Sequence, residues 1–116
     1  TPRARIFARS SFTSASLKEQ VCEARERALL RLRDTPWQLN RDVEGSWIRS
    51  THPPSERILS LIDRPVDRGE LSMRGADLLL RLMWTCADFS GKNTIGLEEF
   101  SCALQLRQGG EHYGIG

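Results

Sequence analysis

The sequence lacks a long apolar segment, which excludes a helix that crosses a membrane. Its most apolar stretch, residues 78–87, is interrupted by Arg81, whereas a transmembrane helix needs about 20 apolar residues. The first residues, Thr1-Pro2-Arg3, contain no apolar core of a secretory signal. With 39% hydrophobic and 28% charged residues, the chain has the composition of a folded domain in water. We expect no membrane contact and a cytoplasmic location.

Cysteine and histidine are scarce. The three cysteines, Cys22, Cys86 and Cys102, lie in helical patterns, without the close pairing of a disulfide scaffold. They are therefore expected to be reduced, buried thiols. Neither His52 nor His112 stands at ligand spacing from a cysteine, so we predict no metal site and no Cys-His catalytic dyad.

Lysine is almost absent, since Lys18 and Lys92 are the only lysines among the 17 basic residues. Arginine suits bidentate pairing with carboxylates and phosphates. The net charge is only +2, and codon preference alone explains such a bias equally well. Arginine content therefore does not by itself predict nucleic-acid binding.

Phosphate-binding and nucleophile motifs are also missing. The chain has no G-x-x-x-x-G-K-[ST] loop, no G-x-G-x-x-G and no G-x-S-x-G. We therefore expect no ATPase or hydrolase activity from these residues alone.

The patterns that are present predict helices. Ser16 and Glu19 form a capping-box pattern ahead of an amphipathic helix that ends near Pro36. A second, short helix is expected after Pro53-Pro54-Ser55 and is predicted to end at Pro65. Between them, residues 35–54 have no period, although five apolar residues indicate that the segment packs on the core: Trp37, Leu39, Val43, Trp47 and Ile48.

Two further helices are predicted in the second half. Ser72 is a good N-cap, Gly91 a good C′ residue, and the run between them is apolar nearly all round, as in a central buried helix. Gly96 precedes a last helix with Glu99 at N3, expected to end near residues 108–110. The fold class is therefore all-α, a small bundle of four to five helices. We expect an arm over residues 1–15, the helical domain over 16–110, and a disordered tail over 111–116.

The start of the third predicted helix is the most suggestive site. Arg74 lies in its first turn, where free backbone N–H groups favour an anion, and Gly75 indicates a close approach by another surface. Arg81 follows one heptad later. A simpler interpretation is that both arginines lie on the surface and pair with Asp77 or Asp88.

A resemblance favours the first interpretation. Residues 71–91 resemble the "LSxRGxxRxLRxAxTxADLxG" region of magnesium-chelatase-like AAA+ proteins of the ComM/YifB type, and the similarity continues to Arg107. Residues 21–27 resemble their "VxxARxRQxxR" helix, and Leu39-Asn40 their "LN" pair. Together these motifs cover residues 17–108. Two departures are Met83-Trp84 before the "TxAD" stretch and the absence of Gln after Arg27.

The resemblance implies the C-terminal helical lid of an AAA+ ATPase. Its Walker motifs would lie in an upstream core of the same chain, and Mg²⁺-ATP would be its cofactor in the full-length protein. Arg74 matches the sensor-2 arginine, which contacts the nucleotide γ-phosphate of its own or a neighbouring subunit. Arg81 and Arg25 match other family arginines, and with Ser72 they are candidate supporting residues.

The family kinship further implies a bacterial, ring-shaped homo-oligomer that acts as a DNA motor or helicase in branch migration or natural transformation. The fragment itself would be inactive, and the parent protein an ATPase. Two alternatives stay open: a free-standing helical DNA-binding module, in which the last two helices are a helix-turn-helix, and the lid of a true metal chelatase subunit.

Overall fold

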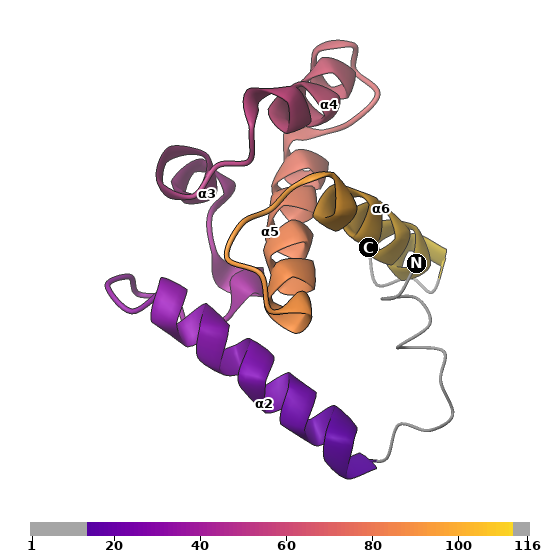
Figure 1. The fold of residues 1–116 in the computed structure, drawn as a ribbon. Coiled ribbons are helices and arrows are strands. Elements are labelled where there is room, and N and C mark those ends of the chain that lie inside the picture. The colour runs from indigo at the N-terminus through magenta and orange to yellow at the C-terminus, as the bar shows by residue number, and fades with distance from the viewer. Residues whose placement is uncertain (1–13, 113–116) are drawn as a thin grey trace.

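The structure is a computed structural model that describes the backbone of residues 14–112 and the side chains of residues 15–108. These residues form helices and no strand, which confirms the predicted all-α class (Figure 1). The elements in chain order are α2 (Ser14–Arg31), η1 (Asn40–Asp42), α3 (Gly45–Thr51), α4 (Glu56–Asp67), α5 (Met73–Ser90) and α6 (Leu97–His112). None of these helices is long and apolar enough to cross a membrane. The predicted arm and tail fall almost wholly outside this part of the chain.

Helix α5 is the centre of the fold. Figure 1 shows it between α2 on one side and α6 on another, with α3 and α4 toward its N-terminal end. Eight of its residues are buried: Ala76, Leu79, Leu80, Met83, Trp84, Cys86, Ala87 and Asp88. The other helices and the connections between them contribute the rest of the core, chiefly Leu32, Val43, Ile48, Ile58, Ile62, Ile95 and Ala103. Because every other element packs on α5, this helix fixes the position of all of them.

Local capping sets both ends of α5, as predicted. The Ser72 hydroxyl accepts the Gly75 N–H at 3.0 Å, and Gly91 ends the helix in the left-handed region at φ 72°. The Glu99 carboxylate likewise accepts the Gly96 N–H at 2.9 Å. These contacts join residues three apart or fewer, which is why the sequence predicts them.

Substituting Gly91 with alanine is expected to lower the free energy of unfolding by about 1–2 kcal/mol, which is the usual cost of placing an L-residue other than glycine in the left-handed helical region. A Cβ there would also lie 3.2 Å from Nη2 of Arg27, so a small contact penalty adds to the backbone strain. Gly69→Ala is the matched control, because Gly69 has φ 74° and no heavy atom within 4 Å of such a Cβ. Urea unfolding of both variants measures the difference. An equal or smaller cost at Gly91 would contradict the contact with Arg27.

Four predicted helix boundaries are wrong, since α2 also ends at Arg31, ahead of the end expected near Pro36. Helix α2 begins at Ser14, so Ser16 lies inside the helix and is not its N-cap. Helix α4 continues past Pro65 to Asp67, since a proline in the last turn removes only one intrahelical bond. The Pro65 carbonyl then accepts the N–H groups of Glu70 and Leu71, at 2.8 and 3.2 Å. Helix α6 extends to His112, beyond the predicted end.

The segment without a period contains helical structure that the sequence did not predict. It holds η1 and the seven-residue helix α3, which has no side-chain hydrogen bond at its N-cap, Glu44. The expectation that the segment packs is confirmed. Val43 and Ile48 are buried, and Trp37 and Trp47 lie against the core.

The expected state of the cysteines is wrong. Cys86 of α5 and Cys102 of α6 form a disulfide, with their Cα atoms 6.5 Å apart. Cys22 is free but exposed. The two paired cysteines are 16 residues apart in sequence and become neighbours only because α6 folds back onto α5, so spacing gave no sign of the pair.

Candidate functional site

The sequence-predicted arginine lies at the start of the central helix. Arg74 is in the first turn of α5, is exposed, and has no hydrogen bond or ion pair to another residue that the structure describes. The alternative prediction, pairing with Asp77 or Asp88, is therefore wrong for Arg74. Its guanidinium is available to an anion at a helix N-terminus, where the helix dipole also favours negative charge.

Gly75 has a local explanation. A Cβ at this position would lie 2.6 Å from Cδ1 of Leu71, whose side chain packs against the core. The close approach expected at Gly75 thus comes from the chain's own Leu71.

The two other arginines implied by the resemblance do not join Arg74 in one site. Arg81 donates from Nη1 to the Val43 carbonyl at 3.3 Å, which ties α5 to the chain before α3. It does not pair with Asp88, whose partner is a different arginine. Arg25 is an exposed residue of α2 that lines a cavity beside Thr85 and Phe89, toward the opposite end of α5.

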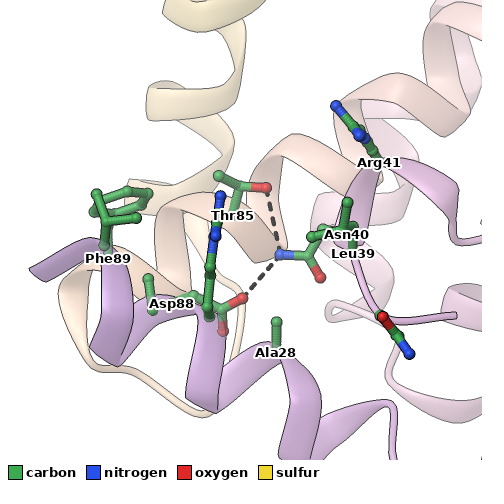
Figure 2. Close-up of a pocket in the computed structure, with 11 residues that line it drawn as sticks. Ala28, Leu39, Asn40, Arg41, Thr85, Asp88 and Phe89 are labelled. Carbon is green, nitrogen blue, oxygen red and sulfur yellow. Dashed lines mark hydrogen bonds between the residues drawn. The ribbon is translucent and has the colours of Figure 1, made fainter. Parts of the chain in front are cut away.

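At this opposite end, several motif residues form a buried polar cluster (Figure 2). The Asp88 side chain is 3% exposed and accepts two hydrogen bonds from Arg31, each 2.7 Å long. Asn40 Nδ2 donates to Asp88 at 2.8 Å and to the Thr85 hydroxyl at 3.4 Å. Arg31 also donates to Asn40 Oδ1 at 2.8 Å, so in this Arg31–Asn40–Asp88 cluster both carboxylate oxygens of Asp88 and both polar atoms of the Asn40 amide have partners.

Further contacts around the cluster fix α2 against α5. Arg27 donates to the Asp88 carbonyl at 3.0 Å, near the C-terminus of α5, where cations are favoured. The Arg31 guanidinium lies 4.2 Å from the ring centroid of Trp84, a distance typical of a cation–π contact. The cluster therefore holds α2, η1 and α5 as one unit.

Sequence analysis missed Arg31. Asn40 and Asp88 belong to motifs that were identified, but Arg31 was not assigned to one. A signal existed, because the last arginine of the "VxxARxRQxxR" pattern falls on Arg31 when its first residue is placed on Val21.

Four rings form a chain of edge-on contacts from the loop to the core. Trp37, Trp47, His52 and Trp84 follow one another with centroid distances of 5.7, 5.2 and 5.8 Å. Burial, and to a smaller degree the charge of Arg31, lower the pKa of His52 below 6.5. The neutral imidazole is thus the form that the fold favours.

His52 should make the domain less stable in mild acid. Because its pKa is lower in the folded state, the unfolded chain binds the proton first, and stability falls as the pH drops below about 6.5. We expect wild type to lose more free energy of unfolding than His52→Gln between about pH 7.5 and about pH 5.5. Urea unfolding at both pH values measures this. An equal loss in the two proteins would show that His52 is not responsible.

A second ion pair joins α3 to α4. Arg49 donates to both carboxylate oxygens of Asp63, at 2.8 and 3.0 Å, and this hydrogen bonding raises the pKa of Arg49. The Asp63 side chain is 43% exposed, so solvent screens this pair far more than it screens Arg31 and Asp88.

The geometry does not favour a helix-turn-helix made of α5 and α6. Helix α5 is the buried core of the fold, and α6 begins with Glu98 and Glu99. Lys92 of the intervening turn already pairs with both carboxylates, at 2.7 and 3.2 Å, which raises the pKa of Lys92. Within the described residues, this turn therefore presents the exposed Glu98 carboxylate and a lysine that is already ion-paired where DNA phosphates would lie.

Comparison with known proteins agrees with the residue patterns. Residues 11–107 match the family model described as "Magnesium chelatase, subunit ChlI C-terminal". Similar curated proteins are uncharacterized proteins of Mycobacterium bovis and of two strains of Mycobacterium tuberculosis. Each is 36% identical over 109 residues, which are 93% of this chain and 22% of the relative. No solved structure matches the chain.

Proposed function

Since the chain belongs to the family of magnesium chelatase ChlI C-terminal domains, we propose that it is the lid of an AAA+ ATPase and that Arg74 is its nucleotide-sensing residue. The ATPase core would lie in the same, longer polypeptide, because the chain spans only 22% of its curated relatives. The observation that carries the proposal is the exposed guanidinium of Arg74 at the capped start of α5, which has no partner among the residues that the structure describes.

The described residues suit a lid. A lid must carry one charged group to the nucleotide and transmit the nucleotide state as movement of a rigid unit. Helix α5 carries Arg74 and is packed against all other elements, so a force on Arg74 moves the domain as a whole. Three links support this stiffness: the Arg31–Asn40–Asp88 cluster, the Arg49–Asp63 pair, and the disulfide between α5 and α6.

The proposed chemistry is electrostatic. Bound Mg²⁺-ATP supplies the phosphoryl group and its charge, and an arginine at that point stabilises negative charge that develops on the phosphate oxygens. Ser72 holds the first turn of α5 through the Gly75 N–H, which orients the backbone that carries Arg74. Arg81 and Arg25 are proposed as supporting residues that do not contact the phosphate. Arg81 supports the structure of the lid, and Arg25 belongs to its surface.

The type of parent protein is proposed from the sequence resemblance. We propose that the parent protein is of the ComM/YifB type, a bacterial, cytoplasmic, ring-forming motor that acts on DNA. The lid of a true metal chelatase subunit is the alternative. The exposed Arg74 fits both, and stimulation of ATP turnover by DNA distinguishes the two.

Two measurements test this function. The full-length protein should hydrolyse ATP, and DNA should raise its turnover, whereas the 116-residue chain alone should hydrolyse none. ATP hydrolysis by the chain alone, or a full-length protein without ATPase activity, would contradict the lid. Turnover that DNA leaves unchanged would contradict the DNA motor.

A titration separates the lid from a DNA-binding module. Amide chemical shifts of the chain should not change in a saturable way when a short DNA duplex is added at low salt. Saturable shifts on one helix face that weaken as salt rises would instead support a DNA-binding module, because phosphate contacts release counterions.

A further inference from the structure

A cavity of about 330 Å³ opens between α2, the chain around η1 and the C-terminal half of α5 (Figure 2). Its walls are mostly apolar and come from all three elements: Val21, Ala24, Ala28, Leu39 and Phe89. Thr85 lies 11 residues beyond Arg74, which is roughly 16 Å along a helix. The cavity is therefore separate from the end of α5 that carries Arg74.

The polar groups at one side of the cavity already have partners. Both Asp88 oxygens accept from Arg31, and one of them also accepts from Asn40. The Thr85 hydroxyl donates to the Arg81 carbonyl at 3.2 Å and accepts from Asn40. Beside Asp88 and Thr85, a group that enters the cavity thus finds polar atoms whose hydrogen bonds are already satisfied, and the exposed amide of Gln38 is a further polar lining group. This favours an apolar side chain over a polar one.

The cavity lining also includes two cations that have no partner in the described part of the chain. Arg25 of α2 and Arg41 of η1 are exposed lining residues, and neither has a hydrogen bond or ion pair to a described residue. The residues three and four positions from Arg25 on α2 include no acid, so the helix itself offers no partner. Apolar walls with two free guanidinium groups match a ligand that combines an apolar group with carboxylates.

We infer that this cavity docks an acidic segment of a partner protein. One large apolar side chain of the segment fills the cavity, and neighbouring carboxylates pair with Arg25 and Arg41. A peptide fits better than nucleic acid, because base edges need free donors and acceptors and the polar atoms around Asp88 are already paired. The inference does not depend on ATP hydrolysis, since the cavity lies toward the end of α5 opposite Arg74.

A fluorescent peptide tests this inference on the 116-residue chain. The probe is a nonapeptide with one central Phe flanked by Asp residues. Its binding is measured by fluorescence anisotropy at low salt. We expect saturable binding that weakens at least tenfold in Arg25→Glu/Arg41→Glu and at least fivefold when Ala replaces the central Phe. The double variant Arg57→Glu/Arg64→Glu, with the same charge change on two exposed residues of α4, should bind as wild type does.

Three outcomes would overturn the inference. The first is the absence of saturable binding by the Phe peptide, and the second is equal weakening by the α4 control, which would indicate only net charge. The third is a short single-stranded DNA that binds through Arg25 and Arg41 more tightly than the peptide, which would assign the surface to nucleic acid. Thermal unfolding of both double variants confirms that each is folded, since all four arginines are exposed.

Discussion

Replacing Asp88 with alanine is expected to lower the free energy of unfolding by about 3–5 kcal/mol, the cost of removing one partner from a buried ion pair. The Arg31 side chain is only 10% exposed and would keep a buried charge without its carboxylate. Asn40 would lose an acceptor at the same time. Since domains of this size are stable by about 5–15 kcal/mol, this one change removes a large part of the total. Urea unfolding of the purified chain measures it.

Asp63→Ala is the matched control, because it also removes a carboxylate that binds an arginine through two hydrogen bonds. That carboxylate is 43% exposed, and exposed pairs contribute about 0–1 kcal/mol. A cost at Asp88 no larger than at Asp63 would contradict the stabilising role of the buried cluster.

A double variant distinguishes the loss of the Arg31–Asp88 ion pair from the cost of leaving Arg31 as an unpaired buried charge. Arg31→Leu/Asp88→Leu removes both charges and keeps apolar volume, and such replacements are often neutral. It should therefore be more stable than Asp88→Ala. If the double variant is the less stable protein, the loss comes from packing and hydrogen bonds and not from the charge left on Arg31.

The second large effect concerns activity. In the full-length protein, Arg74→Ala is expected to lower ATP turnover more than tenfold while nucleotide binding changes little. The reason is that arginines which stabilise the transferred phosphoryl group act mainly in the transition state. Arg74→Lys keeps the charge but loses the planar guanidinium, so it should restore only part of the activity. Steady-state ATPase assays and nucleotide binding measure the two effects separately.

Arg57→Ala provides the control for Arg74. Arg57 is an exposed arginine of α4, on a different element, and its loss should leave turnover unchanged. Near-normal ATP turnover in Arg74→Ala, or an equal loss of turnover in both variants, would show that Arg74 is not the nucleotide-sensing residue. Because Arg74 is exposed and unpaired among the described residues, its replacement should not unfold the domain.

Local signals in the sequence predicted the elements that local contacts form. Ser72 and Gly91 mark the two ends of α5 because each acts within four residues of itself, and the apolar run between them predicted the central position. Helix α3 gave no such signal, since it is short and no side chain caps its start. Pro65 was a misleading stop, because α4 accommodates the loss of this one N–H bond and continues for two more residues to Asp67.

Contacts between distant residues were beyond reach of the sequence pattern. Arg31 and Asp88 are 57 residues apart, and Cys86 and Cys102 meet only when α6 packs on α5. Motifs identified Asp88 and Asn40 as notable without saying what they touch. Arg74 was singled out correctly as a helix-start arginine, but only the structure indicates that its guanidinium has no partner among the described residues.

The arrangement relates stability to the proposed function. The buried Arg31–Asn40–Asp88 cluster and the cavity beside it lie toward one end of α5, and the free arginine lies at the other. A substitution in the cluster should therefore act through folding, whereas a substitution of Arg74 should act on turnover. The two predictions above are separable for this reason.

The most direct test of the lid assignment is photolabelling of the full-length protein with an ATP analogue that carries an aryl azide on its γ-phosphate. Mass spectrometry of the labelled peptides locates the γ-phosphate within this chain. The account predicts label at the start of α5, over residues 71–75, and none in α2 near Leu30, an exposed residue beside Arg31. Label in α2 or α6 and none at the start of α5 would contradict it.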